Sequence, residues 1–304
     1  MAALHAKVIV NPAAGACSTR RKWPIISRLL KSVGFSFDYQ YTEGTGHAIE
    51  LARTATGDGY PFLIAVGGDG TINEVANGIM SSADSGRTTL GMVSTGTGSD
   101  FVRSAGIPRD YAGACSSLTS RRRLLIDVGV VEYVSEGKTK QRFFVNAAGA
   151  GFDAEVVRAT EKWPKYFGGT VPYLAGLLRS LIGYQNKPVV MSLGDETETT
   201  RITTVVVANG GYLGGGMRVV PQAELGDNLL DVMIVDDVSK FELLKTLPRV
   251  YTGTHVTHPK VRMKKTTKIS IGSSEKLLVH ADGEFLGEGP VSFWLKPSAL
   301  SIAV

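Results

Sequence analysis

The chain has 304 residues, 43% of them hydrophobic and 20% charged, and its formal net charge is +5. This balance is typical of a globular protein with a full hydrophobic core, and it excludes a disordered chain or a bundle of membrane helices. The length accommodates one large domain or two of ordinary size.

The first hundred residues alternate between strand and helix patterns. Runs typical of β-strands lie at Ala6–Val10, Phe37–Tyr41, Phe62–Val66 and Leu90–Val93. Apolar residues at helical spacing lie between them, at Trp23–Val33, His47–Thr54 and Ile72–Met80. Strands separated by helices of this length predict βαβ units with a parallel sheet. Ligands bind such sheets at the carboxyl ends of the strands.

After about Asp127 the pattern changes to a series of strands separated by turns. The predicted strands are Val128–Val134, Gln141–Ala147, Val189–Leu193, Thr203–Ala208, Leu229–Val235, Lys268–Ile271, Leu277–Ala281 and Val291–Leu295. Two helical stretches, Asp153–Lys162 and Tyr173–Leu181, interrupt the series. This pattern predicts a mostly antiparallel second domain, a β-sandwich. Because no Pro-rich or Ser-rich linker marks the boundary, we expect two closely packed domains with a cleft between them.

Three features predict a cytoplasmic protein that is at most peripherally bound to a membrane. The two cysteines, Cys17 and Cys115, lack metal-binding spacing and suit a reducing compartment. No basic-then-apolar signal region opens the sequence. The longest apolar stretch, Val171–Tyr184, is interrupted by Arg179 and falls short of the roughly 20 residues that span a bilayer.

Basic residues cluster at Arg20–Lys22, Arg121–Arg123 and Arg262–Lys268. Each cluster alone is consistent with an ordinary solvated face, but together they suit a phosphate-rich partner or an anionic membrane surface. Nucleic acid is not expected as a partner, because the sequence has no zinc-finger spacing, no RNP-type aromatic motif and no clear helix-turn-helix.

The strongest motif is Gly-Gly-Asp-Gly-Thr-Ile-Asn-Glu, from Gly67 to Glu74, directly after a predicted buried strand. Glycines at this point let the backbone approach a phosphate, and the following helix offers unpaired N–H groups and a positive dipole end. A carboxylate in an anion-binding loop is costly unless a cation bridges it. Asp69 is therefore a candidate magnesium ligand, directly or through water. The alternative is a tight turn that needs glycine only, and the Thr and Asn-Glu continuation argues against it.

Three further loops follow predicted strands in the same way. They are Asn11–Gly15, Thr42-Glu43 and Ser94–Phe101. Their small hydroxyl and glycine residues suit a nucleotide pocket, and Asp100 adds a second acid. Because all these loops follow strands of one sheet, a shared ligand site at its edge explains them better than separate turns do.

Together with the late segment Ala281–Glu284, these motifs resemble those of a known family. The patterns NPxxG, GGDGTxNEVxNG, a GT-rich loop ending in Asp-Phe, and Asp-Gly-Glu are similar to those of the diacylglycerol-kinase catalytic-domain superfamily. That superfamily includes bacterial lipid kinases, sphingosine kinases and ceramide kinases. The resemblance runs from Val8 to the C-terminal end, and the bacterial members match this sequence best in length.

The resemblance implies an N-terminal phosphofructokinase-like parallel α/β domain, a C-terminal mostly antiparallel β-sandwich domain, and ATP in the cleft between them. The first domain would span residues 1–127 together with a strand at 296–304, and the second would span residues 128–295. The implied activity is an ATP- and Mg-dependent transfer of the γ-phosphoryl group to the hydroxyl of a lipid such as diacylglycerol. The resemblance also implies association with the inner face of the membrane, and it leaves a homodimer open.

Residue by residue, the resemblance assigns nucleotide contacts to Asn11, Pro12, Gly15, Thr42, Gly67, Gly68, Asp69, Gly70, Thr71, Ile72, Asn73, Glu74, Gly96 and Thr97. It assigns the catalytic magnesium, partly through water, to Asp69, Asp100 and Asp127. Asp282 or Glu284 would be the general base, and the sequence leaves open which of the two. A structural magnesium would be held by the Asp227 carboxylate and by the carbonyls of Glu224 and Leu229, unless this segment is a plain Asp-Asn turn.

The sequence departs from the family pattern at two positions. Ser99 stands where the third motif usually has Asn, and a serine hydroxyl can still donate one hydrogen bond. Asn228 stands where the metal loop usually has Gly, and Asn tolerates the left-handed conformation, so we expect the turn to survive.

Lipid handling is assigned to a set of apolar side chains in the second domain, which form an acyl-chain groove, a membrane-facing patch or simply core. They are Phe152, Trp163, Tyr166, Phe167, Tyr173, Leu177 and Leu178.

Two other functions stay open. An NAD kinase shares the GGDG core, but the Thr71–Val75 continuation and the late Asp-Gly-Glu favour a lipid kinase. A non-catalytic nucleotide-binding regulatory protein would be expected to lack an acid, whereas Asp69, Asp100, Asp282 and Glu284 are all present. The sequence lacks G-x-x-x-x-G-K-[ST], H-R-D and D-F-G, which excludes P-loop and protein kinases.

Overall fold

The computed structural model describes residues 4–120, 122–161 and 170–304. The chain divides into two compact units, the first formed by Met1–Ile126 with Ser298–Val304 and the second by Asp127–Pro297. Two strands pass from one unit to the other, β5 (Arg123–Ser135) and β14 (Glu284–Ala303). None of the described helices has the length and apolar character that crossing a bilayer requires.

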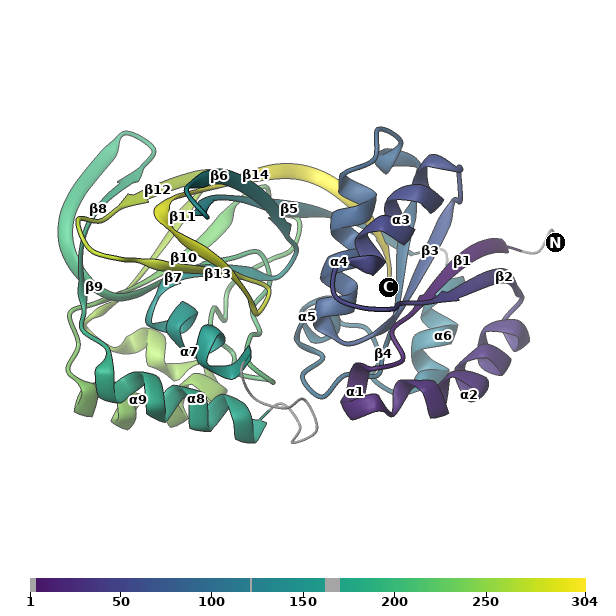
Figure 1. The fold of residues 1–304 in the computed structure, drawn as a ribbon, viewed down its shortest axis with the longest axis horizontal. Coiled ribbons are helices and arrows are strands. Elements are labelled where there is room, and N and C mark those ends of the chain that lie inside the picture. Colours follow the sequence, from purple (N-terminus) through teal and green to yellow (C-terminus); the bar gives the residue numbers. More distant parts are fainter. Residues whose placement is uncertain (1–3, 121, 162–169) are drawn as a thin grey trace. The chain divides into compact units, whose positions relative to one another are not determined.

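The first unit is built on a parallel sheet (Figure 1). Its strands are β1 (Leu4–Val10), β2 (Phe35–Tyr41), β3 (Phe62–Gly67) and β4 (Thr89–Ser94). They pair in the order β2-β1-β3-β4, and the end of β14 adds a parallel strand beside β4 through Ser301 and Ile302. The four predicted strands and their parallel arrangement are confirmed, because the apolar runs that bury a strand on both faces are unambiguous here.

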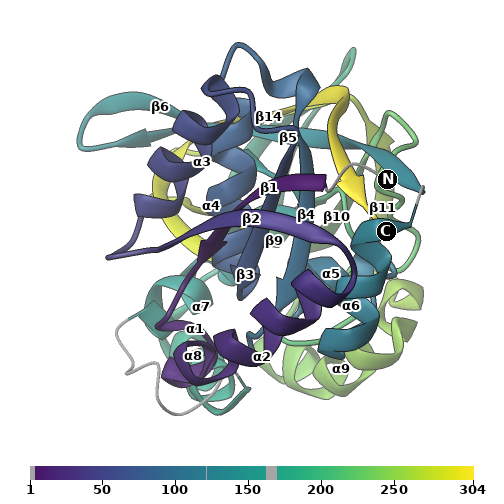
Figure 2. The ribbon, with the colours of Figure 1, turned by 90° about the vertical axis from the view of Figure 1, so that its right-hand side faces the viewer.

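Helices cover both faces of this sheet. They are α1 (Ala14–Cys17), α2 (Thr19–Ser32), α3 (His47–Gly57), α4 (Asp69–Met80), α5 (Asp100–Ser104) and α6 (Tyr111–Thr119), with a 3₁₀ turn, η1 (Ser85–Arg87). Figure 2 shows α3 and α4 on one side of the strands and α2 and α6 on the other. Trp23, Ile26 and Leu30 of α2 pack with Cys115 and Leu118 of α6 in one buried cluster. The helices predicted around α2, α3 and α4 are confirmed, whereas the short α5 and the Ser- and Ala-rich α6 have no predicted counterpart.

The strands of the second unit are antiparallel. They are β5, β6 (Lys138–Phe144), β7 (Ala147–Gly151), β8 (Lys187–Leu193), β9 (Glu196–Ala208), β10 (Leu230–Asp236), β11 (Val261–Thr266), β12 (Lys268–Gly272), β13 (Leu278–Ala281) and β14. Six of them pair in a closed ring, β9-β7-β13-β14-β12-β8 and back to β9. Apolar side chains such as Val205, Ile271 and Phe293 form the core of this part. The predicted antiparallel arrangement is confirmed.

The second unit differs from the prediction in three places. The expected single strand Gln141–Ala147 is wrong, because the chain turns at residues 145–146 and divides it into β6 and β7. The two predicted helical stretches are confirmed as α7 (Phe152–Glu161) and α8 (Thr170–Gly183). A further helix, α9 (Lys240–Thr252), is followed by the 3₁₀ turn η3 (Thr254–Thr257), and neither these nor β11 were predicted.

Candidate active site

The loops that follow the parallel strands of the first unit contact one another. The backbone amide of Asn11, after β1, donates to the Val66 carbonyl over 2.9 Å, and the amide of Thr95, after β4, donates to the Gly67 carbonyl over 2.8 Å. The Asn11 side chain donates to the Thr71 hydroxyl over 2.9 Å. The NPxxG, GGDGT and GT-rich motifs therefore form one connected group of loops at the carboxyl edge of the sheet, where α/β folds bind ligands.

Glycine is required where these loops approach one another most closely. A Cβ atom on Gly96 would lie 2.7 Å from the Gly68 Cα, which is closer than real Cβ contacts allow. Gly15 has a φ of 58°, in the left-handed region, and a Cβ there would lie 2.3 Å from the Thr95 carbonyl oxygen. The glycines thus let three loops pack backbone to backbone.

Two carboxylates lie together at this edge. Asp69 opens α4 and Asp100 opens α5; the Asp100 side chain is buried and Asp69 is partly buried. Burial, together with the neighbouring Asp100 carboxylate, raises the pKa of Asp69 to about 6. The backbone amide of Phe101 donates to Asp69 Oδ1 over 3.1 Å, so Asp69 also holds the start of α5. Two neighbouring acids in a glycine-lined setting suit a divalent cation, which supplies the positive charge that the pair lacks.

Glu74, predicted to contact the nucleotide, is bound elsewhere in the first unit. Its Oε1 accepts a hydrogen bond from the Gly46 amide at 2.9 Å, and its Oε2 accepts one from the Ala48 amide at 3.1 Å. These amides belong to the first turn of α3, whose Gly46 N-cap has no capping side chain. The Glu74 carboxylate supplies the acceptors that such a turn needs.

Ile72 and Asn73, two other residues of the α4 motif, are both buried. The Ile72 side chain is fully buried and its amide donates to the Gly68 carbonyl, so it belongs to the core of the unit. The Asn77 side chain donates to the Asn73 side-chain oxygen over 3.1 Å, within α4 itself. The Ile72 side chain is therefore part of the core, and the Asn73 side chain is engaged within α4.

The predicted Asp-Gly-Glu motif lies in the second unit, at the turn between β13 and β14. Asp282 has a φ of 46° and accepts three backbone hydrogen bonds, from the amides of Val145, Asn146 and Ala147 at 2.9, 3.0 and 2.9 Å. These bonds shape the turn that separates β6 from β7. Glu284 instead meets a side chain, the Arg142 guanidinium, at 2.8 Å.

A lysine ammonium group from β11 contacts the segment predicted to hold a structural magnesium. Lys265 Nζ lies 2.6 Å from Asp227 Oδ2 and 3.4 Å from a carboxylate oxygen of Asp231, which is 1% exposed. Asp231 and Lys265 are direct partners across β10 and β11. Asn228 has a φ of 61°, which confirms that asparagine keeps the left-handed turn. The Asp227 carboxylate thus fits a cation, and in this structure Lys265 provides one.

Asp127, predicted to join Asp69 and Asp100 at the catalytic magnesium, belongs to the second unit. It is fully buried, and its Oδ2 accepts a hydrogen bond from the Asn228 amide at 2.7 Å. Its own amide donates to the Leu225 carbonyl over 2.7 Å. Among the residues that the structure describes, no three acid, histidine or cysteine side chains gather closely enough to hold a metal on their own.

Comparison with known proteins identifies the family. Residues 5–131 match the diacylglycerol kinase catalytic domain, and residues 146–304 match the YegS C-terminal NAD kinase beta sandwich-like domain. A diacylglycerol kinase of Staphylococcus aureus (strain Newman) is 30% identical over 291 residues, which cover 95% of this chain and 89% of that protein. The chain belongs to the bacterial diacylglycerol kinase-like family of lipid kinases.

Further relatives of this lipid kinase agree in sequence and in fold. A diacylglycerol kinase of Staphylococcus carnosus is 28% identical over 289 residues, 95% of this chain and 91% of that protein. A crystal structure of a diacylglycerol kinase from Bacillus anthracis str. Sterne has a TM-score of 0.74 at 21% identity, covering 100% of this chain and 97% of that one. A second structure from the same strain has a TM-score of 0.79 at 22% identity, covering 99% and 97%. At these identities the two structures establish the fold alone.

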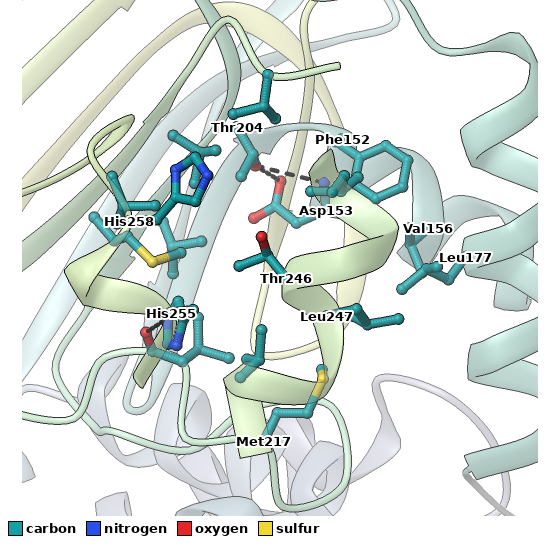
Figure 3. A pocket seen from close by; sticks show the side chains of 18 of the residues that line it. Phe152, Asp153, Val156, Leu177, Thr204, Met217, Thr246, Leu247, His255 and His258 are labelled. Atoms are coloured by element: carbon teal, nitrogen blue, oxygen red, sulfur yellow. Dashed lines mark hydrogen bonds between the residues drawn. The ribbon is translucent and has the colours of Figure 1, made fainter. Parts of the chain in front are cut away.

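The second unit of the kinase contains an apolar pocket, shown in Figure 3. It lies between α7, α8 and α9 and the strands β9, β10 and β11. Phe152 and Leu177, two of the side chains assigned to lipid handling, line it, whereas Leu178 is exposed. Trp163, Tyr166 and Phe167 lie outside the described residues, as does the side chain of Tyr173.

Polar side chains also belong to the pocket wall, and two of them, Asp153 and Thr204, are joined to each other. Asp153 accepts a hydrogen bond from the Thr204 hydroxyl at 2.7 Å, and its other oxygen lies 3.0 Å from Nε2 of the fully buried His280 (Figure 3 labels Asp153 and Thr204). Sequence reasoning missed most of the lining, including Met217, Thr246, Leu247 and His255. Thr246 and Leu247 come from α9, the helix that the sequence did not predict.

Proposed function

We propose that this lipid kinase uses ATP and Mg²⁺ and transfers the γ-phosphoryl group to the hydroxyl of a lipid such as diacylglycerol, in phospholipid biosynthesis or lipid recycling. The observation that carries the proposal is the pair of neighbouring acids Asp69 and Asp100 among the glycine-rich loops of the first unit. Glycine-lined backbone suits phosphate, and an acid pair in the same place suits the cation that accompanies a nucleotide.

In this proposal the residues of the first unit bind and orient ATP. The backbone of Gly68 and Gly70 and the start of α4 receive the phosphates, since no side chain caps that helix. Asp69 and Asp100 would hold the magnesium ion, whose chemistry is to neutralise charge on the phosphate oxygens. Catalysis then depends mainly on positioning and charge neutralisation.

Glu284 is the better supported general base. Both oxygens of Asp282 accept backbone hydrogen bonds, which supports a structural role for that carboxylate. The Glu284 carboxylate instead contacts the Arg142 side chain, and a positioned carboxylate can accept a proton from the lipid hydroxyl.

We assign the apolar pocket of the second unit to an acyl chain. Its walls are formed by apolar side chains such as Leu177, Met217 and Leu247, and they suit a hydrocarbon tail. Asp153 and Thr204 provide a polar point on the same wall. A cytoplasmic location stays a prediction of the sequence, and a homodimer stays open.

The test is phosphoryl transfer from ATP labelled at the γ-position. Purified protein is incubated in separate reactions with diacylglycerol, phosphatidylglycerol, a sphingoid base, a polyprenol and NAD, each with and without EDTA. We expect labelled phosphatidic acid, no labelled NADP, and loss of transfer with EDTA. Asp69→Asn should abolish transfer, and Asp84→Asn, an exposed acid of the same unit, should not. Transfer to NAD alone would instead make the protein an NAD kinase, and normal turnover by Asp69→Asn would remove the proposed role of Asp69.

A further inference from the structure

Exposed apolar side chains of this protein gather on two neighbouring helices. Ten large apolar side chains are exposed in the described part of the chain, and five of them lie on α8 and α9. They are Leu178, Ile182, Phe241, Leu244 and Tyr251, and Ile182 and Phe241 are 80% and 76% exposed. The two helices pack together through Leu177, Leu181, Leu243 and Leu247, and both lie at one end of the second unit (Figure 1). This concentration exceeds the scatter of single apolar residues on ordinary surfaces.

The apolar residues of α9 extend beyond the face that lines the pocket. Leu243, Leu247 and Val250 line the pocket on its inner face. Phe241, Leu244 and Tyr251 are spaced by three and seven residues, so they form one exposed stripe, the outer stripe, beside the pocket-lining face. A helix that merely covers a protein core has a polar outer face, so the outer stripe of α9 requires a separate explanation.

The charges on these two helices have one predominant sign. Together α8 and α9 carry four basic residues, Arg179, Lys240, Lys245 and Arg249, against a single acid, Glu242. Glu242 is already engaged, because it forms the capping box of α9 with Ser239 and pairs with Lys260 at 3.2 Å. The Lys240 ammonium donates to the Ile182 carbonyl over 2.6 Å, so cations and exposed apolar groups alternate where the helices meet.

We propose that the outer surface of α8 and α9 docks on an anionic phospholipid bilayer. Apolar side chains flanked by lysine and arginine are the pattern of helices that lie in the membrane interface, where the cations meet lipid phosphates. A second copy of the chain suits this surface poorly, since a twofold contact would place the cations of one copy against those of the other.

The docking surface is continuous with the apolar pocket. Leu244 is 41% exposed on the outer stripe and also lines the pocket, so the pocket reaches the surface at this residue. A bilayer docked on α9 therefore lies at the pocket opening, and a lipid tail can enter without crossing water. This last step rests on the proposed lipid kinase function, whereas the docking itself does not.

The experiment is flotation of the whole protein with vesicles, independent of any kinase assay. The vesicles contain either phosphatidylcholine alone or equal parts of phosphatidylcholine and phosphatidylglycerol. We expect binding to the anionic vesicles only, and binding that is weaker by about tenfold or more for Ile182→Ser with Phe241→Ser. Lys245→Glu should also weaken binding. Lys138→Glu makes the same charge change on β6, at the opposite end of the unit, and should bind as the unmodified protein does (Figure 1).

The activity arm separates docking from catalysis. The Ile182→Ser, Phe241→Ser variant should lose activity on diacylglycerol in anionic vesicles and keep it on a soluble short-chain diacylglycerol. Unchanged vesicle binding by this variant, or equal binding of the unmodified protein to both vesicle types, would overturn the proposal. So would a dimer of the unmodified protein that the variant converts to monomer, because the surface would then join two copies. If no lipid is phosphorylated at all, the proposed function fails while the flotation result still decides the docking.

Discussion

Glu74 and Ala48 are joined by a hydrogen bond in which the Ala48 amide donates to the Glu74 carboxylate over 3.1 Å. The second oxygen of the same carboxylate accepts from Gly46. The Asn-Glu continuation of the glycine-rich motif, which favoured a lipid kinase over an NAD kinase, thus connects α4 to the first turn of α3. This contact gives the motif a physical role that does not involve the nucleotide directly.

Replacing Glu74 with Ala should lower the free energy of unfolding by about 1–3 kcal/mol, because two amides of α3 lose a charged acceptor in a buried place. Urea denaturation measures this change. Glu50→Ala alters an acid in the first turn of the same helix that no described hydrogen bond engages, and it should have a much smaller effect. A fully stable Glu74→Ala protein with a raised KM for ATP would return Glu74 to the nucleotide site.

The two acids of the Asp-Gly-Glu motif should respond differently to amide substitution. Asp282→Asn replaces one of the two acceptor oxygens by an NH₂ group, which then faces one or two of the three backbone amides, so stability should fall by about 1–3 kcal/mol. Glu284→Gln should keep its stability and lower kcat by about 10²–10⁴-fold with little change in KM, as expected for loss of a general base. Thermal unfolding and steady-state kinetics on both variants test this division. The reverse outcome would make Asp282 the base.

Lys265→Met should destabilise the second unit by about 3 kcal/mol, since it leaves the buried Asp231 carboxylate and Asp227 without a cation. Melting curves recorded with EDTA and with Mg²⁺, without nucleotide, measure the effect. We expect the unmodified protein to melt at the same temperature in both, and Mg²⁺ to restore part of the stability of the variant. A Mg²⁺-dependent melting temperature of the unmodified protein that Asp227→Asn removes would show that this loop holds metal alongside Lys265.

Filling the apolar pocket should weaken lipid binding selectively. Thr246 lines the pocket from α9, and Thr246→Trp should raise the KM for a long-chain diacylglycerol by about tenfold or more while the KM for ATP stays unchanged. Thr252→Trp places the same side chain at an exposed position on the same helix and serves as the control. Equal KM values for the two variants would place the acyl chain elsewhere.

The sequence predicted most of the architecture because its strands have strong local signals. Buried runs such as Phe62–Val66 are apolar throughout, and their periodicity leaves little choice. The helix α9 escaped prediction although Ser239, Glu242 and Gly253 mark its start and end. Pro248 lies inside it, and a proline in a sequence usually argues against a continuous helix.

The candidate site was predictable in its residue types but not in all of their contacts. The glycine-rich loops and Asp69 follow from strand ends and phosphate chemistry, which are local features. The contacts of Asp282 with the β6–β7 turn join residues 135 to 137 positions apart, and the Lys265 pairing needs the register of β10 against β11. Such contacts arise from tertiary packing. A sequence motif therefore shows that an acid is present, but it does not show which groups that acid hydrogen-bonds or pairs with.

The passage of β14 from the second unit to the first has a consequence for folding during synthesis. Residues 298–304 complete the first unit, and Ser301 and Ile302 pair with β4 more than 200 positions earlier in the chain. The edge of β4 must therefore stay uncovered on the ribosome until the whole second unit has been translated. The first unit, which carries the glycine-rich loops, is therefore the first to be synthesised and the last to complete its sheet. Truncation before Ser298 should leave an open sheet edge that is prone to aggregate.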